Sequence, residues 1–537
     1  MPSLSAPNGE FLVQFNNRVK LLVGAATLAL SAGACKPDLE ITNPNNPDVE
    51  RAISTPGDVR NLIGNSYNGA YLAMQGNARP YPGIATGVMA DVISMSFGNF
   101  GARFNGQEPR LAYNNSSAAD DGRLSSDPYE QLYAALGAVN DGLGAIKRGI
   151  KLQTSATAPD ETPEMTAFGY LVQGMTLGSV GLVFDKGFIV DEDTPLGTAT
   201  LVPYGDVSTA ALAKYDKAIA AAAGKTWTIP AEFTGGMTLT ADRFGRMANT
   251  LAARQLAYTP RNAAENTAVN WARVLGYAEK GISSGTPFNL QVEGDGGTLW
   301  YDLLKYYGES ESWVRVDQRV IQLMDPSQPV VYTSETPPPR AQSVDLRLGT
   351  TANPGTDYKF FAVIRNAPAR GVYFFSQWQH VRYYFTSFEN GTDLLGTLPY
   401  VIAAENDLLI AEALVRTGGD KARAATLINK TRVGRGGLPG VTGGSSTNDL
   451  LAAIFYERDV ELINTGAGQG WFDRRRIDTS LTYNGLPIGN TWAFRGGNSL
   501  QKGTPRHLPV PAKELETLGV PVYTYGGDSP NPVFPEK

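Results

Sequence analysis

Two stretches of this 537-residue chain gather tryptophan and tyrosine beside side chains that form hydrogen bonds. The first cluster consists of Trp300, Tyr301, Tyr306, Tyr307 and Trp313, with Asp302 and Arg315 among them. The second cluster consists of Tyr373, Trp378, Tyr383 and Tyr384, with Gln377 beside them. An aromatic ring offers a ligand an apolar face, while carboxylate, amide and guanidinium groups bond its hydroxyl groups. We predict that at least one cluster faces a ligand; the alternative for each residue is a place in the core.

Residue types that bind metals or catalyse reactions are sparse or poorly spaced. The two histidines, His380 and His507, lie far apart with no cysteine near either, which argues against a zinc site. Four acidic residues could ligate calcium, but their spacing does not fit an EF-hand loop, and we interpret them as a solvated acidic loop: Asp185, Asp191, Glu192 and Asp193. Glu309 and Glu311 resemble a glycosidase pair, yet a chain with 52 acidic residues offers many such pairs. We therefore predict no catalytic residue, no metal and no cofactor.

A basic run at residues 471–476, Trp-Phe-Asp-Arg-Arg-Arg, would suit a phosphate or a nucleic acid if it were exposed. Because it follows Glu457 and Glu461 closely, we predict an internal set of salt bridges instead. The whole chain has 46 basic and 52 acidic residues, a net charge of −6. This mildly acidic balance argues against nucleic acid as a partner.

The amino-terminal residues have the pattern of a bacterial export signal. Arg18 and Lys20 precede the apolar run 21–30, which is too short to span a bilayer, and the small residues 31–34 follow. Cys35 comes next and is the only cysteine of the chain, so this segment resembles the lipobox of lipoproteins, although Ala32 stands where leucine is usual. We predict a signal peptide at 1–34 and a lipidated Cys35 with a tether at 35–54. The alternative is a plain secretory signal with an incidental cysteine.

Helical periodicity organises most of the remaining chain. Apolar residues recur at helical spacing in segments 59–74, 127–146, 164–184, 207–223, 243–258, 268–282 and 400–416. Gly418 and Gly419 end the last of these, and Asp420 is a suitable N-cap for the helix after it, so residues 398–437 form a helical hairpin. Alanine-rich seams recur in several of these helices. We predict a mainly α fold, a tetratricopeptide-like scaffold of helical hairpins.

The periodicity fades between residues 283 and 396, where prolines cluster and aromatic residues alternate with polar ones. This pattern favours a loop-rich, irregular second lobe with short strands, and it contains both aromatic clusters. We therefore predict three parts beyond the tether: an amino-terminal part of the scaffold at 55–282, a ligand-binding lobe at 283–396, and a carboxy-terminal hairpin with a closing segment at 397–537.

Three carboxy-terminal blocks resemble the SusD/RagB family. They are the segments 404–438 (AENDLLIAEALVRTGGDKARAATLINKTRVGRGGL), 456–476 (YERDVELINTGAGQGWFDRRR) and 508–515 (LPVPAKEL). The cysteine, the tether and a first helix with Gly69 and Tyr71 also follow the family's order. Two segments depart from it: residues 466–470 replace a Glu-Gly-x-Arg sequence, and residues 184–192 lack a Tyr-Gly-Asp-Pro sequence.

The resemblance implies a role as well as a fold. Members of this family are outer-membrane lipoproteins at the cell surface, not enzymes, and they cap a TonB-dependent (SusC-like) transporter as a lid. They capture nutrients, usually oligosaccharides and sometimes peptides, through the looped lobe, while the helical half faces the transporter. On this interpretation the aromatic faces of the two clusters cover sugar rings. A secreted glycoside hydrolase and a purely structural scaffold remain the alternatives from other classes.

Overall fold

A computed structural model gives the structure of this chain. It describes residues 55–76, 82–95, 98, 101–107, 110–119, 123–195, 197–283, 288–310, 314–329, 337–362, 376–383, 395–477, 482–483, 486–487 and 500–527. These belong to one compact unit, Thr55–Lys537. The predicted signal peptide, Cys35 and the tether lie outside the described residues.

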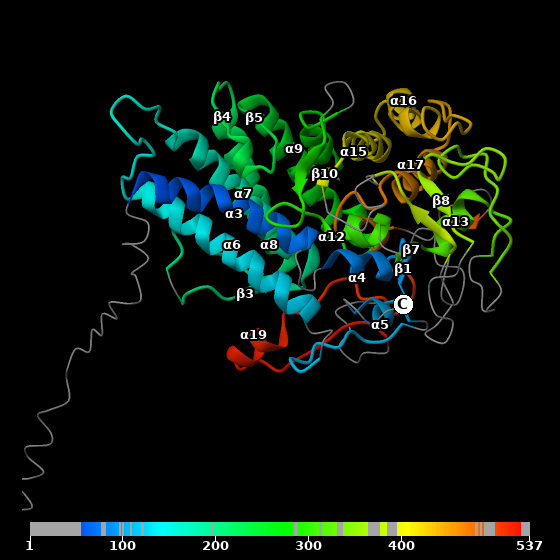
Figure 1. The fold of residues 1–537 in the computed structure, drawn as a ribbon, viewed down its shortest axis with the longest axis horizontal. Helices are drawn as coiled ribbons and strands as arrows, with labels where there is room; N and C mark the ends of the chain where they lie inside the picture. The colour runs from blue at the N-terminus through cyan, green and yellow to red at the C-terminus, as the bar shows by residue number, and fades with distance from the viewer. Residues whose placement is uncertain are drawn as a thin grey trace, which may run out of the picture. The chain divides into compact units, whose positions relative to one another are not determined.

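Five long helices form the amino-terminal part of the scaffold, and each packs against the next (Figure 1). They are α3 (Pro56–Gln75), α6 (Arg123–Lys147), α7 (Thr162–Val183), α8 (Tyr204–Ala222) and α9 (Ala241–Tyr258). The start of α3 follows from local chemistry, since the Thr55 hydroxyl accepts a hydrogen bond from the Asp58 amide and Pro56 occupies the first turn. Thr240 caps α9 in the same way. The predicted helices in this region are confirmed, apart from shifts of a few residues at their ends.

Glycines on α7 allow its neighbours to approach closely. A Cβ at Gly174 would lie 2.7 Å from the ring of Tyr215 on α8, and one at Gly169 would lie 2.7 Å from Leu143 on α6. Both distances are too short for a real side chain, so these contacts require glycine. The helix α7 is the one described helix whose length and hydropathy would suit a membrane span, but 83% of that window is buried inside the protein. It is therefore a core helix.

A second group of helices carries the predicted hairpin. It comprises α11 (Trp271–Ala278), α15 (Ala403–Arg416), α16 (Lys421–Arg432), α17 (Thr447–Glu461) and the short α18 (Gln469–Arg474). Gly418 adopts a positive φ between α15 and α16, and Asp420 caps α16 by accepting from the Arg423 amide, as predicted. One boundary prediction is wrong: Tyr400 and Val401 belong to strand β10 (Leu395–Val401), not to the helix. The pairing of their strand with β6 outweighs their helical pattern.

Short strands connect the loop-rich segments. The antiparallel pairs are β1 (Ile93–Met95) with β7 (Val314–Val316), β2 (Lys186–Phe188) with β3 (Leu201–Pro203), β4 (Thr228–Ile229) with β5 (Leu239–Thr240), β6 (Leu290–Asp295) with β10, β8 (Tyr358–Phe360) with β9 (Trp378–His380), and β11 (Thr482–Tyr483) with β12 (Leu486–Pro487). The remaining short helices are α4 (Pro82–Met89), α5 (Ala102–Asn105), η3 (Ala231–Phe233), α10 (Ala263–Thr267), α12 (Leu303–Lys305), the π-helix η4 (Tyr306–Ser310), α13 (Gln318–Met324) and α19 (Ala512–Thr517).

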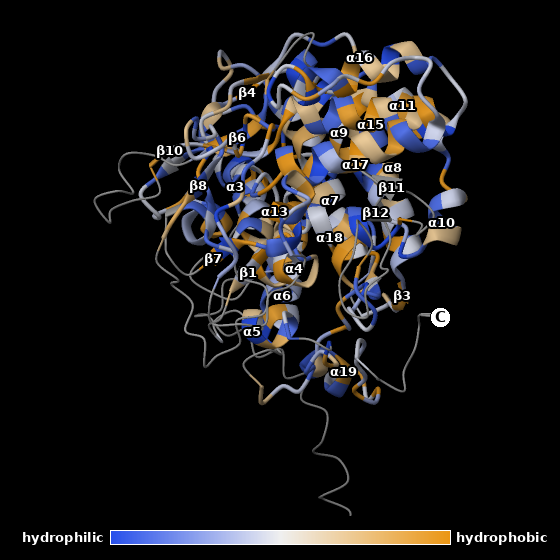
Figure 2. Cartoon of the chain, turned by 90° about the vertical axis from the view of Figure 1, so that its right-hand side faces the viewer, coloured by the Kyte–Doolittle hydropathy of each residue, from blue (hydrophilic) through white to orange (hydrophobic). Residues whose placement is uncertain are grey.

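The mainly α prediction with short strands is thus confirmed. Apolar residues gather on α4, which Figure 2 colours strongly hydrophobic and which is almost entirely buried. The boundaries that we predict at residues 282 and 396 stay predictions. One strand pair, β6 with β10, links residues 290–295 to residues 395–401 and so crosses the second boundary.

Candidate functional site

The π-helix η4 lies at the centre of the first aromatic cluster. It follows directly on α12, whose N-cap Asp302 accepts a hydrogen bond from the Lys305 amide and forms a 2.8 Å ion pair with the Lys305 ammonium group. Both side chains are fully buried. Asp302 therefore shapes the backbone before η4, and its carboxylate does not reach the surface. A π-helical turn is wider than an α-helical turn and points its side chains in different directions, and such turns occur often at functional sites.

Glu309 ties this turn to the rest of the protein. Its carboxylate accepts a hydrogen bond from Nδ1 of His380 on β9 (2.5 Å) and one from the Tyr383 amide (2.6 Å). Asn464, which adopts a positive φ after α17, approaches the same carboxylate at 3.5 Å. The Glu309 side chain is buried. One carboxylate thus holds η4, the turn after β9 and the end of α17 together. This structural role differs from that of a glycosidase acid, and Glu311 lies outside the described residues.

Three tyrosines surround this anchored turn: Tyr306 and Tyr307 on η4, and Tyr383 after β9. We call them the η4 tyrosine cluster. All three are half-buried, the rings of Tyr306 and Tyr307 meet edge to face at 5.1 Å, and Lys305 lies 5.5 Å from the Tyr383 ring. Burial raises the pKa of Tyr383, and its hydroxyl is itself buried. Tyr301 is also half-buried and precedes α12. The rings of Tyr301, Tyr306 and Tyr307 can offer apolar faces with hydroxyl groups.

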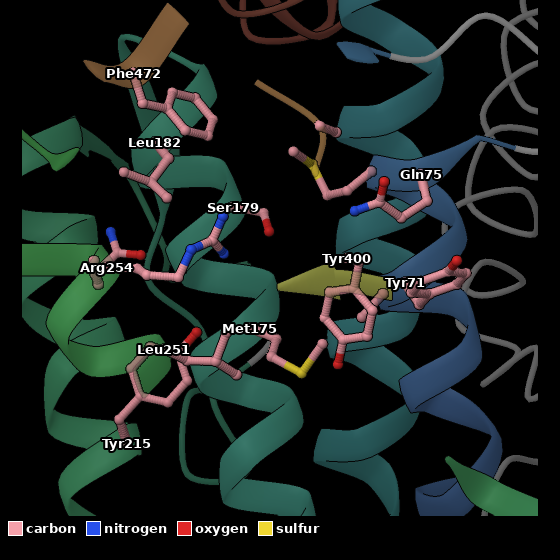
Figure 3. Close-up of a pocket in the computed structure, with 14 residues that line it drawn as sticks. Tyr71, Gln75, Met175, Ser179, Leu182, Tyr215, Leu251, Arg254, Tyr400 and Phe472 are labelled. Atoms are coloured by element: carbon pink, nitrogen blue, oxygen red, sulfur yellow. The ribbon is translucent and has the colours of Figure 1, made fainter. Parts of the chain in front are cut away.

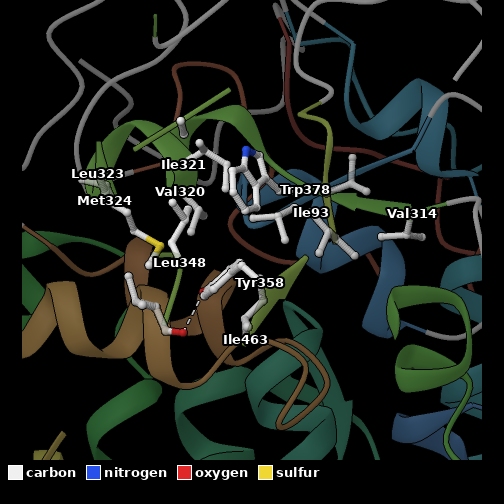
Figure 4. Close-up of a cluster of buried hydrophobic side chains, with 14 of the residues drawn as sticks. Ile93, Val314, Val320, Ile321, Leu323, Met324, Leu348, Tyr358, Trp378 and Ile463 are labelled. Carbon is white, nitrogen blue, oxygen red and sulfur yellow. Dashed lines mark hydrogen bonds between the residues drawn. The ribbon is translucent and has the colours of Figure 1, made fainter. Parts of the chain in front are cut away.

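Both described tryptophans of the two clusters are core residues by position. Trp300 is 7% exposed and packs against the rings of Tyr67 and Tyr71 on α3, at centroid distances of 6.0 and 5.7 Å. Trp378 is 3% exposed and lies beside Ile93 and Ile321 in a hydrophobic cluster (Figure 4).

Arg315 is 2% exposed on β7, where its guanidinium donates to the Val314 carbonyl. Gln377 donates to the Ala362 carbonyl. The remaining candidates, Trp313, Tyr373 and Tyr384, lie outside the described residues. The assignment of any of these residues to a ligand stays a prediction, and the half-buried tyrosines are those whose position suits it best.

The arginine run is internal, but its partners differ from those that we predict. Arg476 binds Glu412 through two bonds of 2.8 Å, and Arg474 lies 3.4 Å from Asp91. Arg475 donates to backbone carbonyls, including that of Leu182. Glu457 and Glu461 instead bind Arg347, at 2.7 and 3.2 Å. The run therefore stabilises the scaffold and offers nothing to a nucleic acid.

The acidic residues near position 190 have cationic or hydroxyl partners. Lys214 binds Asp191 at 3.0 Å and approaches Glu192 at 3.5 Å, while Lys147 binds Asp193. The Asp185 carboxylate is buried and accepts hydrogen bonds from the hydroxyls of Tyr523 and Tyr525. Burial raises the pKa of Asp185 despite these bonds. Among the described residues no group of acidic, histidine or cysteine side chains has the geometry of a metal site.

A cavity of about 80 Å³ lies between α3, α7, α8, α9 and β10 (Figure 3). Its walls are aromatic and apolar on several sides, with Tyr71, Tyr215, Tyr400, Met74, Met175 and Leu251. Four polar side chains also line it, namely Gln75, Ser179, Arg254 and Gln255. The sequence shows no signal for this set, because its members are separated by up to hundreds of residues and each looks like an ordinary helix position. Their proximity arises only when the helices pack.

Comparisons with known proteins agree on the fold. Residues 400–516 match the model of the SusD family. The surface glycan-binding protein A from Bacteroides uniformis has a similar structure, with a TM-score of 0.57 and 15% identity over 87% of this chain and 99% of that one. A SusD superfamily protein from Parabacteroides distasonis gives a TM-score of 0.60 and 12% identity over 86% of this chain and 97% of its own. A search of curated protein sequences finds no match. At these identities the structures share the fold.

Proposed function

We propose that this chain is a member of the SusD/RagB family and a lipid-anchored protein of the outer-membrane surface that binds a glycan. It would pass that glycan to a TonB-dependent transporter, for which it would act as the lid. The observation that carries this proposal is the family match over residues 400–516, within a fold that matches nearly the full length of glycan-binding and SusD-type structures. We propose that the protein itself is not an enzyme.

The η4 tyrosine cluster is the surface that we assign to the glycan. A sugar ring has an apolar face of C–H groups and a rim of hydroxyls, and a tyrosine ring with a neutral hydroxyl suits both. The half-buried position of Tyr306 and Tyr307 means that each ring is held by its surroundings before a ligand arrives. The hydrogen bond from the Tyr383 amide to Glu309 fixes the η4 turn, so the turn loses little conformational freedom when a glycan binds.

Calorimetry with a panel of oligosaccharides and peptides tests this assignment. We expect saturable binding of an oligosaccharide, and we expect the double variant Tyr306→Ala/Tyr307→Ala to weaken it at least tenfold. Tyr170→Ala is the matched control, because Tyr170 is also half-buried and lies on α7, in the helical scaffold. Binding that the double variant leaves unchanged would place the glycan elsewhere.

The same panel separates the rival functions. Saturable binding of peptides alone would make the protein a peptide-capturing member of its family. Release of shorter glycans by the purified protein, abolished by replacing a carboxylate, would make it a hydrolase and refute the proposal. Co-purification with a large outer-membrane barrel protein, after mild detergent extraction, tests the transporter partnership.

A further inference from the structure

The cavity lined by Tyr400 contains a buried polar group, the Gln75 amide oxygen, that no other side chain bonds among the described residues. Gln75 is 5% exposed, and its Oε1 has no hydrogen-bond partner among the described residues. A buried amide without a partner costs free energy, so native structures rarely keep one without a reason. Figure 3 shows the Gln75 amide on one side of the cavity and the Arg254 guanidinium and Ser179 hydroxyl on the other.

Arg254 is charged and only partly engaged. Its Nε donates to Oε1 of Glu405 at 2.8 Å, and within the described residues its terminal nitrogens form no hydrogen bond. Burial opposes its charge, but Glu405 outweighs this effect and raises the pKa of Arg254. Tyr400, on the opposite wall, has a pKa raised well above its ordinary value by burial and is therefore neutral. The cavity thus contains a guanidinium whose charge Glu405 already balances.

The cavity has room for a small molecule. A single water molecule needs roughly 10–15 Å³ of cavity volume, so a cavity of about 80 Å³ has room for about six waters. That is the scale of a triol or tetrol, and it is smaller than a typical site for a drug-sized ligand. Met74, Met175 and Leu251 supply apolar surface for the carbon atoms of such a molecule.

Hydrogen-bond chemistry selects among small molecules. The terminal nitrogens of Arg254 only donate, whereas the oxygen of Gln75 only accepts. A carboxylate accepts but cannot donate, so it could bond Arg254 and the Gln75 NH₂ group but would leave the Gln75 Oε1 without a donor. A hydroxyl group both donates and accepts, so two hydroxyls of one molecule can satisfy both residues. The charge balance at Glu405 also favours a neutral molecule over an anion.

We propose that this cavity is a binding site for a small neutral polyol, held between Arg254 and Gln75. The site is separate from the η4 tyrosine cluster and does not rest on the glycan-binding function proposed above. It gives the helical scaffold a ligand of its own.

Saturation-transfer difference NMR on the purified protein tests the proposal, with glycerol and erythritol as the polyols and acetate and propionate as the anions. We expect saturable transfer to both polyols and none to the anions. Gln75→Met keeps the side-chain volume and removes the amide, so we expect at least a fivefold loss of the polyol signal. Gln131→Met on α6 is the matched control, since Gln131 does not line the cavity, and it should retain the signal.

Other outcomes would overturn the proposal. Transfer to the carboxylates in place of the polyols would identify an anion site, and no transfer to either class would mean that only water enters. An unchanged polyol signal in Gln75→Met would place the binding elsewhere. If Gln75→Met failed to fold, Ser179→Val would fill the cavity from the opposite wall, and it too must abolish the signal.

Discussion

Glu412 on α15 holds the most heavily charged part of the core. Its carboxylate accepts from Arg476 at 2.8 Å twice, from Arg458 at 2.6 Å and from Arg416 at 2.7 Å. Asp473 shares two of these arginines. Burial would raise the pKa of Glu412, but the arginines outweigh burial and hold it well below its ordinary value of 4.5. This ion-pair group connects α15, α17 and the residues after α18.

We predict that Glu412→Gln destabilises the fold strongly. The amide has a similar shape, but its NH₂ group faces arginine donors and leaves buried guanidinium charge without compensation. Breaking a buried pair in this way costs about 3–5 kcal/mol. For a unit of roughly 480 residues the unfolding entropy is about 1 kcal/mol/K, so the Tm should fall by about 3–5 °C.

Thermal unfolding followed by circular dichroism measures this effect. The matched control is Glu279→Gln, because Glu279 forms a 2.6 Å ion pair with Arg423 but its side chain is 40% exposed. Such a surface pair contributes about 0–1 kcal/mol, so the control should lower the Tm by less than about 1 °C. Equal shifts in the two variants would refute the reasoning that burial makes Glu412 important.

The pH dependence of the same variant gives a second test. A carboxylate whose folded-state pKa is depressed stabilises the protein at every pH above its unfolded-state pKa, near 4.5. That contribution is lost as the pH falls below this value towards the folded-state pKa. The difference in Tm between the native protein and Glu412→Gln should therefore be constant between pH 7 and about pH 5 and shrink only in more acidic solution. A difference that shrinks between pH 7 and pH 6 would contradict the assignment.

Two further predictions concern glycine packing and the lipid anchor. Gly174→Ala should lower the free energy of unfolding by about 1–3 kcal/mol, because its Cβ would lie 2.7 Å from the buried ring of Tyr215. The control is Gly137→Ala on α6, where nothing lies within 4 Å; it should be neutral or stabilise the protein by up to about 1 kcal/mol. Equal losses in both variants would mean that close packing is not the cause. Cys35→Ala should abolish incorporation of labelled fatty acid and release the protein from the membrane fraction, whereas retained labelling would refute the lipobox.

Much of the fold could be predicted from local sequence patterns. The α15–α16 hairpin could be predicted because its determinants are close in sequence: an apolar stripe, Gly418 with its positive φ, and the Asp420 cap. The same holds for α3 and its Thr55 cap. The error at Tyr400 has the opposite cause, since β6, which pairs with the strand of Tyr400, is about a hundred residues away.

The candidate site was less accessible to prediction. Tryptophan and tyrosine look alike in a loop-rich sequence, whether they face solvent or core. Trp300 is buried because α3 brings Tyr67 and Tyr71 against it, and Trp378 because β9 packs into the cluster of Figure 4. Tyr306 and Tyr307 are half-buried on η4, and Tyr307 packs against the outside of that cluster.

The amino-acid sequence was enough to indicate the family, the helical class and the lone cysteine, because short motifs and helical periodicity express these directly. Contacts between distant segments could not be inferred from it. Arg476 with Glu412, Glu309 with His380, and Gln75 across from Arg254 are each brought together by helix and strand packing. The groups that a ligand can reach therefore depend on tertiary contacts, since burial and hydrogen-bond partners determine which polar and aromatic side chains stay accessible.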